Sequence, residues 1–430
     1  MRFRMEAMGM RVRQQTELHL WQHGAIFLFA CAILITRHPD AIFHAQFWAE
    51  DGHVWFADSY NFGWWAALLR PQDGYFQTCP RLAASLALLV PLSMAPLALN
   101  LILVVAQALP VNLLLSARSS AWGSLRFRAL MAAVYLALPN CAERSLGVGY
   151  TQWLMALSAF LILVGSAPRS IAGRIFNFLI VALSGLTGPF SVFLAPVALI
   201  LAWRHRDRSR LVPACVIAAC ALVQVWGLLI LNPSGRSHYA ALGASPALFI
   251  RILARQIYLA ALFGRNGLSA PSDDRLLGFL LCIAVAGTAI VALCFAKSAI
   301  QMKLFLIFSA VLFVASLISP NTHSPAAGSA WELLAITGGI RYWFFPTLAF
   351  AWSILWCLHS RIAILKVVAA YLLVFMCIGI VHDWRLPALQ DLQFAESARR
   401  FEAAPAGTVV TFPLNPAGWN MQLVKRQSGK

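Results

Sequence analysis

The chain has 430 residues, of which 60% are hydrophobic and only 11% are charged, and its mean hydropathy is +0.73. Soluble domains carry about a quarter charged residues, so this composition excludes an ordinary soluble fold and indicates a protein that uses lipid as its solvent. The formal net charge is +17. Because Lys and Arg are spread in small groups between apolar runs, this charge favours membrane orientation and contact with membrane lipids, not nucleic-acid binding.

Apolar runs that could cross a membrane recur along the whole chain. The first follows a basic N-terminal segment but has no clean cleavage site, so we expect an uncleaved first span. Because each crossing needs roughly 20 residues, the sequence predicts an all-α polytopic membrane protein with about 11 transmembrane helices. They are expected at residues 18–36, 95–117, 128–140, 150–166, 175–187, 190–203, 211–231, 276–296, 303–320, 342–358 and 364–382.

The positions of Lys and Arg orient these spans. With a cytoplasmic N-terminus, 17 of the 33 Lys and Arg residues fall in six short cytoplasmic segments, as the positive-inside rule requires. We therefore expect a multi-pass protein of a bacterial inner membrane, with its N-terminus in the cytoplasm and its C-terminus in the periplasm. The six segments are residues 1–17, 117–128, 167–174, 204–210, 297–303 and 359–366.

We expect a transmembrane domain at residues 1–382, with a first outer loop at 37–81 and a second outer loop at 140–150. The remaining segment, residues 383–430, contains a charged helical stretch followed by a strand and a turn. This pattern predicts a small α/β C-terminal tail on the outer, periplasmic face.

Three further apolar or aromatic segments would disturb the alternation of the loops if they crossed the membrane. They are residues 52–69, 82–92 and 250–262. Aromatic rings suit the headgroup level, where one edge is wet, so we expect helices that lie in the outer interface.

Acidic residues are scarce in this chain and cluster in the first outer loop. Glu50 and Asp51 follow the aromatic pair Phe47-Trp48. A carboxylate near an apolar surface is disfavoured in its charged form, so its pKa rises toward that of a useful base. Alternatively, Asp51 caps the following helix and Glu50 is merely solvated, and the residues alone leave both interpretations open.

The second outer loop adds Glu143, which could orient an acceptor, hold a metal ion or pair with the neighbouring Arg144. Carboxylates from two loops do not define a metal site by spacing, so no metal ligands are predicted, although a divalent cation is allowed. The nine Cys residues show no metal-binding spacing. Two of them, Cys79 and Cys141, lie in or beside the predicted outer loops, where a disulfide is chemically allowed.

Arg81 and Arg341 each stand at an outer membrane boundary beside aromatic residues, Phe76 for the first and Tyr342-Trp343 for the second. The planar guanidinium offers several donors to phosphate oxygens while its neighbours lie against lipid. This placement suits a lipid-linked phosphate, and interfacial anchoring is the alternative.

The layout resembles the GT-C superfamily of membrane glycosyltransferases. The resemblance is carried by the acidic motif FWAEDG at residues 47–52, by Glu143 in the second loop, and by GYFQTCPRLAA at residues 74–84. It implies inverting transfer of a sugar from a polyprenyl-phosphate-sugar donor to an envelope glycan, lipid or protein acceptor. The chain differs from the best-known branches in having Glu before Asp and no large soluble C-terminal domain.

Site residues also follow from the resemblance. Asp51 or Glu50 would be the catalytic base, and Arg341 or Arg81 would bind the donor phosphate. The remaining candidates for substrate binding are Glu143, Tyr342, Tyr75 and His53.

Two other functions stay open. A lipid or solute transporter or flippase would place charged residues within the spans, and the predicted spans contain almost none. An envelope polysaccharide polymerase or ligase would use one long late outer loop, for which residues 232–275 are long enough.

Overall fold

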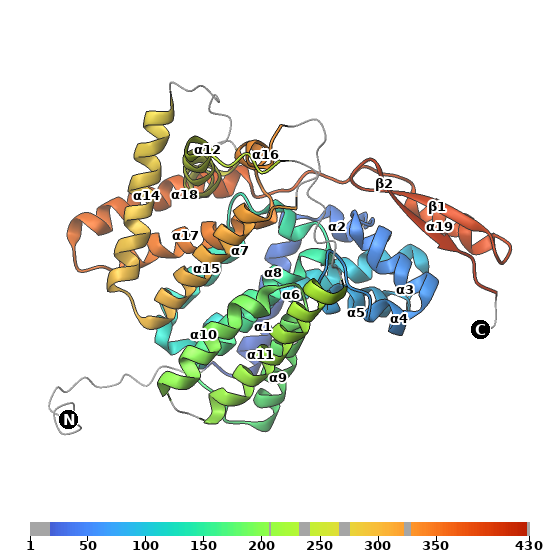
Figure 1. Cartoon of the computed structure of the whole chain (residues 1–430), viewed down its shortest axis with the longest axis horizontal. Helices are drawn as coiled ribbons and strands as arrows, with labels where there is room; N and C mark the ends of the chain where they lie inside the picture. Colours follow the sequence, from blue (N-terminus) through green and yellow to red (C-terminus); the bar gives the residue numbers. More distant parts are fainter. Residues whose placement is uncertain (1–17, 206–207, 232–240, 266–275, 322–327, 428–430) are drawn as a thin grey trace.

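The computed structural model describes residues 18–205, 208–231, 241–265, 276–321 and 328–427, and these residues form a predominantly helical protein (Figure 1). Residues 1–17 and Arg206, which belong to the predicted cytoplasmic segments, lie outside the described residues, as does much of the predicted outer loop at residues 232–275.

Every predicted apolar run is helical in the structure. The corresponding helices are α1 (Leu20–Arg37), α6 (Ala95–Leu115), α7 (Leu125–Ala137), α8 (Thr151–Val164), α9 (Ile171–Gly185), α10 (Phe190–His205), α11 (Arg208–Trp226), α14 (Leu277–Lys297), α15 (Ile300–Ile318), α17 (Phe344–Leu358) and α18 (Ala363–His382). A π-helical turn, η6 (Gly227–Leu231), extends α11.

Within the described residues, seven helices are long and apolar enough to cross a membrane, or eight if the bent pair α16–α17 counts as one span. This confirms an α-helical, multi-pass membrane protein. The structure does not reach the predicted number of spans by this measure, because α7, α8, α9 and α10 have only 13, 14, 15 and 16 residues. A helix of that length rises about 20–24 Å, less than the roughly 30 Å of a hydrocarbon core.

One of the seven helices is a segment that we expected in the interface. It comprises α12 (Pro246–Arg251), η7 (Ile252–Leu259) and α13 (Ala260–Phe263) and is 18 residues long. Figure 1 shows α12 nearly end-on, whereas α14 and α15 run in the plane of the picture. The segment therefore runs at a steep angle to the bundle helices, as an interfacial helix would. Its length is also sufficient to span a membrane.

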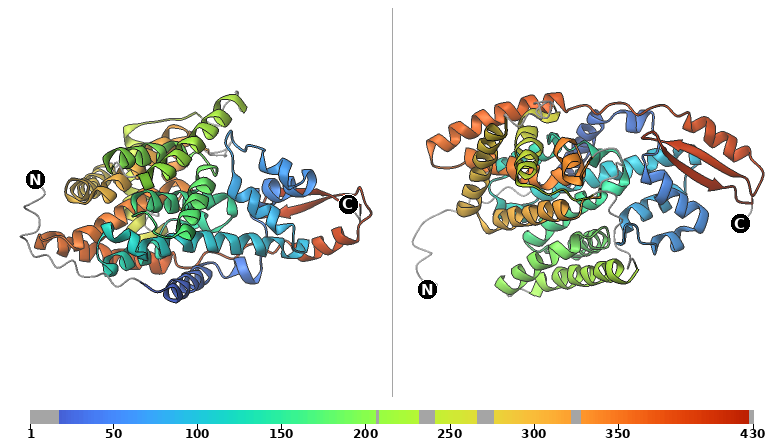
Figure 2. Two further views of the ribbon diagram at one scale, coloured as in Figure 1. Left: turned by 90° about the horizontal axis from the view of Figure 1, so that it is seen from below. Right: turned by 45° about the horizontal axis from the view of Figure 1, so that its top comes forward.

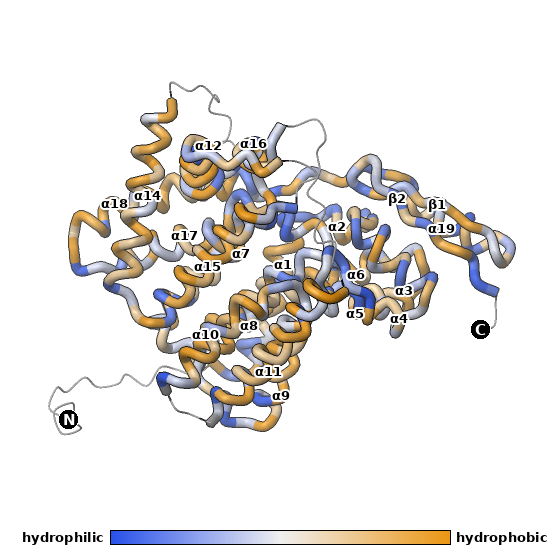
Figure 3. The backbone as a smooth tube through the Cα atoms, viewed as in Figure 1, coloured by the Kyte–Doolittle hydropathy of each residue, from blue (hydrophilic) through white to orange (hydrophobic). Residues whose placement is uncertain are grey.

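The centre of the bundle consists of α8 and α17. Every residue of α8 is buried, and so are most residues of α17, including Trp352. Both helices are apolar all round, as a helix surrounded by protein must be. Helices α1, α14 and α18 instead leave most of their apolar side chains exposed, which gives the bundle a lipid-compatible surface. Figure 3 shows these apolar residues along the bundle helices.

The first outer loop folds into short helices at one end of the bundle. They are α2 (Asp40–Phe43), η1 (Asp51–Phe56), α3 (Ala57–Phe62), α4 (Trp64–Leu68) and α5 (Thr78–Ala87). Trp55 and Phe56 are buried, whereas Phe62, Trp64 and Trp65 are exposed. The loop thus has one side that packs on protein and one aromatic side free for the membrane interface.

The C-terminal tail packs against this loop, as the two views of Figure 2 show. It contains α19 (Phe394–Ala403) and an antiparallel hairpin of β1 (Val409–Leu414) and β2 (Trp419–Val424). The structure confirms the small α/β tail expected from the sequence. Phe394, Phe412 and Leu414 share one hydrophobic core with Phe47 and Trp55 of the first loop, so the tail and this loop lie at the same end of the molecule.

Candidate active site

A cavity of about 420 Å³ lies at the end of the bundle where α8, α10 and α17 begin. Its polar lining forms two walls, one at the first outer loop and one around Arg341. The polar residues are Glu50, Asp51, Gln72, Asp73, Tyr75, Gln77, Tyr150, Gln152, Asn321, Arg341 and Tyr342. Its apolar wall comes from α10, η6, α15 and α17 and includes Phe190, Phe193, Leu228, Leu312, Ala315 and Phe345. Five of the residues selected from the sequence therefore line one cavity, namely Glu50, Asp51, Tyr75, Arg341 and Tyr342.

The backbone of the acidic motif is held by the C-terminal tail. Trp48 forms a parallel bridge with Asn415, and the amide of Ala49 donates to the carbonyl of Asn415 at 2.5 Å. Ala49 has φ +37°, a left-handed conformation that an L-residue adopts only where its surroundings impose it. A Cβ on Gly52 would lie 2.9 Å from Cδ1 of Leu414. The tail therefore fixes the turn that presents Glu50 and Asp51.

His53 belongs to the same contact. Its Nδ1 lies 2.6 Å from the carbonyl oxygen of Asn420, and its ring packs edge-on against Trp419. We expected His53 to bind substrate, but its position makes it a contact to β2. Asn61 adds two hydrogen bonds to the same strand, one to the carbonyl of Gln422 and one from the amide of Val424.

The Asp51 carboxylate joins the first outer loop to the second. It is 3% exposed and accepts hydrogen bonds from the backbone amides of Val148 at 3.0 Å and Gly149 at 3.5 Å. A Cβ on Gly147 would lie 2.8 Å from its Oδ1, so a side chain there would push the carboxylate away. Burial raises the pKa of Asp51 well above its usual range, although the two amides oppose the shift.

The Glu50 carboxylate lines the cavity without such support. Among the described residues, no other residue donates a hydrogen bond to it or forms an ion pair with it, and its own backbone amide is its donor. Burial raises its pKa, and the nearby Glu143 and Asp73 act in the same direction, whereas Arg341 lowers it. Glu50 is therefore the less restrained of the two motif carboxylates.

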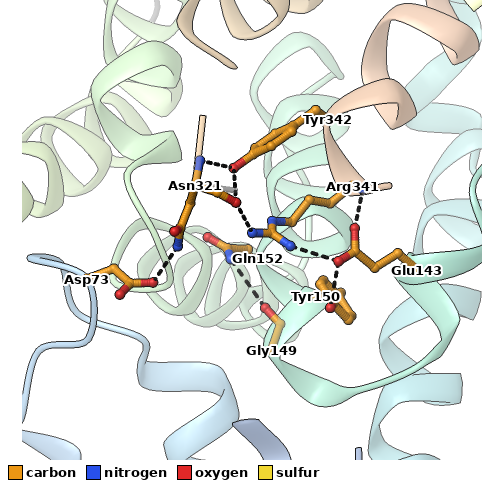
Figure 4. Close-up of polar contacts among 8 residues, drawn as sticks. All are labelled: Asp73, Glu143, Gly149, Tyr150, Gln152, Asn321, Arg341 and Tyr342. Carbon is orange, nitrogen blue, oxygen red and sulfur yellow. Dashed lines mark hydrogen bonds and ion pairs between the residues drawn. The ribbon is translucent and has the colours of Figure 1, made fainter. Parts of the chain in front are cut away.

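The opposite polar wall is built around Arg341, as Figure 4 shows. The chain bends by 72° between α16 (Ala330–Ile336) and the helix that begins at Arg341. The guanidinium of Arg341 lies 2.7 Å from Oε1 of Glu143, and the backbone amide of Arg341 donates to Oε2 at 2.5 Å. Tyr150 also donates to Oε1 of Glu143 at 2.8 Å. Glu143 reaches the cavity through these partners, so the sequence-selected pair Glu143 and Arg341 forms one unit.

A hydrogen-bonded chain joins the two walls across one side of the cavity. Asn321 donates through Nδ2 to Asp73 at 3.1 Å and through its backbone amide to the hydroxyl of Tyr342 at 2.7 Å. The carbonyl of Asn321 accepts from Arg341 at 3.3 Å. Sequence reasoning missed Asn321, because an Asn after a helix is ordinarily a capping or turn residue.

The second outer loop is positioned by a second residue that sequence reasoning missed, Asn140. Asn140 has φ +53°, and its backbone amide donates to the Asp383 carboxylate at 2.8 Å. Its side-chain Oδ1 accepts from the backbone amide of Gly339 at 2.5 Å. The carbonyl of Gly339 in turn accepts from the amide of Glu143 at 2.9 Å. Asn140 and Gly339 thus hold the Glu143–Arg341 unit in place from behind.

Arg81 lies away from the cavity, contrary to its expected role at the donor phosphate. It is 1% exposed and pairs with Asp58 at 2.9 Å, while its Nε donates to the carbonyl of Arg70. Arg81 does not line the cavity, and the described contacts of its guanidinium are with residues of the first loop. Cys79 and Cys141 are both free and buried, and the disulfide considered from the sequence is not formed.

Among the described residues, no three His, Cys, Asp or Glu side chains lie close enough together to hold a metal ion. Compared with known proteins, the chain matches no protein-family model, and no curated protein is significantly similar to it. Its function must therefore be argued from the cavity.

Proposed function

We propose that this chain is a membrane glycosyltransferase of GT-C-like architecture. In this proposal it transfers a sugar from a polyprenyl-phosphate donor to an envelope glycan, lipid or protein at the periplasmic face of a bacterial inner membrane. The observation that carries the proposal is a cavity with two polar walls and one apolar wall. Its size falls within the range of roughly 300–1,000 Å³ typical of small-molecule sites.

The apolar wall accounts for a lipid-linked substrate. Leu228, Leu312 and Phe345 line the cavity, and the residues that follow Leu228 on η6, Leu229 and Ile230, are exposed on the surface of the bundle. An isoprenoid chain would exchange lipid for these side chains at little cost, because both surroundings are apolar. The phosphate and the sugar would then lie against the polar walls.

The two polar walls supply the two groups that glycosyl transfer needs, a carboxylate as base and a cation for the leaving phosphate. An acceptor hydroxyl would attack the anomeric carbon and lose its proton to a carboxylate, while the bond from that carbon to the phosphate oxygen breaks. The electron pair leaves with the phosphate, whose developing charge faces Arg341. The anomeric carbon would be inverted, because the acceptor and the leaving phosphate occupy opposite sides.

Glu50 is the better candidate for the base. A base must release and regain its proton during each cycle, and the Glu50 carboxylate lines the cavity without a partner from any other described residue. Asp51 is committed to the amides of Val148 and Gly149, which suits a residue that holds the two outer loops together. Arg341 keeps further N–H donors for a phosphate while it is paired with Glu143, because a guanidinium carries five.

The test is transfer by the purified full chain in lipid nanodiscs, with a radiolabelled polyprenyl-phosphate sugar and membrane glycolipid acceptors. We expect Glu50→Gln and Asp51→Asn to fold and insert but to lose transfer, Glu50→Gln by about 100-fold or more, as for a general base. Glu402→Gln, an exposed carboxylate of the tail, is the matched control. Full activity of Glu50→Gln would eliminate the proposed base, and uptake of substrate into proteoliposomes without a covalent product would favour a transporter.

Orientation can be tested independently of catalysis. We expect a membrane-impermeant thiol reagent to label a cysteine introduced at Asn61, beside the tail, from outside spheroplasts. A cysteine at Arg361 should react only after the membrane is opened. The reverse pattern would place the cavity in the cytoplasm, where a periplasmic transferase cannot act.

A further inference from the structure

A second polar region lies at the other end of the bundle. Two neighbouring hollows, the larger of about 370 Å³, lie between α8, α9, α10 and α11. They share the wall residues Ala167, Pro168, Asn177, Ser209 and Pro213. The candidate active site uses the first residues of α8 and α10, whereas the smaller hollow uses their last turns, including Leu163 and Leu201. The two regions therefore face opposite ends of the same helices.

The side chain of Asn177 is buried, and its Oδ1 accepts no hydrogen bond from the described residues. Its side chain is 6% exposed, lines both hollows, and leaves Oδ1 buried without a donor among the described residues. Its neighbours on α9, Phe176 and Phe178, are exposed apolar residues. A buried amide oxygen without a donor costs free energy, which a polar ligand in the hollows would offset.

The electrostatic field in the hollows is positive. Arg174 lines the larger hollow and Arg210 the smaller one, where its Nη1 donates to the carbonyl of Leu163 at 3.0 Å. Helices α9 and α11 also begin here, so the positive ends of their dipoles add to the field. Among the residues that the structure describes, no Asp or Glu lines either hollow, and Asp207, the sole acidic residue in the sequence between positions 144 and 272, lies outside them. The ligand should therefore be an anion.

The larger hollow also has an apolar side. Phe178 is 48% and Val212 is 60% exposed, and both line it together with Val216. A soluble phosphate would gain nothing from these side chains, whereas the glycerol and acyl portions of a phospholipid would cover them. The buried Oδ1 of Asn177 needs a donor, which a hydroxyl of a glycerol headgroup provides.

We propose that these hollows bind the headgroup of an anionic phospholipid with a hydroxylated headgroup, of the phosphatidylglycerol type, in the leaflet opposite to the candidate active site. Arg174 and Arg210 contact the phosphate, and Asn177 contacts the phosphate and the headgroup hydroxyl. The site is separate from the cavity that holds Glu50 and does not depend on the proposed transferase activity. It gives a structural role to basic residues that the sequence assigns only to orientation.

The experiment is native mass spectrometry of the purified full chain, titrated with phosphatidylglycerol in detergent, with phosphatidylcholine as the neutral lipid. We expect Arg174→Gln/Arg210→Gln to weaken phosphatidylglycerol binding by about 30-fold, because each cation near an anionic headgroup contributes about fivefold. Asn177→Leu, which keeps both charges, should weaken it by a smaller factor. Arg361→Gln, which removes an exposed charge from another loop, should leave binding unchanged.

Three results would overturn the proposal. The first is equal loss of binding in Arg361→Gln and in the double variant, which would mean that anionic lipid follows overall charge. The second is equal protection of the chain against thermal unfolding by millimolar glycerol phosphate and by phosphatidylglycerol, which would make the ligand a soluble phosphate. Retention of phosphatidylglycerol by both Asn177→Leu and the double variant would also place the lipid elsewhere.

Discussion

The two polar walls of the candidate cavity are held in different ways. On the first-loop wall, the tail fixes the backbone at Ala49 and two amides hold Asp51, but no other residue in the described part of the chain pairs with the Glu50 carboxylate. On the opposite wall, Arg341 is bound to Glu143 through both its side chain and its backbone. A carboxylate left unpaired in a largely buried place costs stability, and proteins tolerate that cost mainly where function needs it. The difference favours proton transfer on the first wall and substrate binding on the second.

The restraint of the first wall comes from the far end of the sequence. Leu414 packs on Gly52 in the buried contact between β1 and the acidic motif. We expect Leu414→Ala to cost about 2–5 kcal/mol of stability locally, as truncation of a buried Leu does. Because the contact also fixes the turn at Ala49, transfer activity should fall by at least about tenfold. Thermal unfolding in detergent and turnover assays would measure the two effects.

Leu423→Ala is the matched control for this prediction. Leu423 is equally buried in the same hairpin, but it pairs with Val410 near the distal end of the strands. Its truncation should destabilise the hairpin by a similar amount and leave turnover close to normal. Equal loss of turnover in both variants would show that the tail supports overall folding and does not position the acidic motif.

Much of the fold could be predicted from the sequence, because hydropathy is a strong signal over 20 residues. Every expected apolar run is a helix, and the tail has the expected helix and hairpin. The number of spans could not be settled in this way. Helices such as α9 are short for a bilayer, and hydropathy does not distinguish a short tilted span from a helix packed within protein.

The site was predicted in part. Scarce acids at a membrane boundary led to Glu50, Asp51 and Glu143, because a charge in such a chain needs a reason. Arg81 and His53 satisfied the same pattern and proved to be contacts within the first loop and to the tail. Whether such a residue lines the cavity or makes a structural contact depends on which segment packs against its side chain. Asp58 pairs with Arg81, and Asn420 contacts His53. The local sequence does not predict these contacts.

Gly147→Ala tests the support of Asp51 and is expected to have an intermediate effect. Gly147 is extended, with φ −162°, so alanine fits its backbone. The new Cβ would lie 2.8 Å from Oδ1 of Asp51 and would displace the carboxylate from the amides of Val148 and Gly149. We expect a loss of about 1–3 kcal/mol, within the usual range for overpacking, measured by thermal unfolding.

A double-mutant cycle identifies the cause. In an Asp51→Ala background, Gly147→Ala should cost much less, because the clashing carboxylate is gone. Gly24→Ala in α1, where no atom lies within 4 Å of the new Cβ, should be neutral or slightly stabilising. Additive costs of Gly147→Ala and Asp51→Ala would show that Asp51 does not lie against Gly147.

The smallest expected effect is the change in stability on replacing Glu50. It tests the contrast between the two polar walls most sharply, because the two walls predict stability changes of opposite sign. Burial raises the pKa of Glu50 in the folded chain, so the folded state binds this proton more tightly than the unfolded state does. The stability that Glu50 contributes is therefore present below its unfolded pKa and is lost as the pH rises through the raised value. Glu50→Gln should match the wild type in acid and become more stable than the wild type above that pH, by about 1 kcal/mol or less.

Glu143→Gln should behave in the opposite way, because it removes the charge that pairs with Arg341 at 2.7 Å and leaves a partly buried cation without its partner. Unfolding temperatures of both variants, measured from acidic to neutral and alkaline pH, would show the two signs. A Glu50→Gln chain that loses stability at neutral pH would mean that Glu50, too, is a structural partner in the folded protein. In that case the first wall would hold no free carboxylate, and Asp51 would have to supply the base.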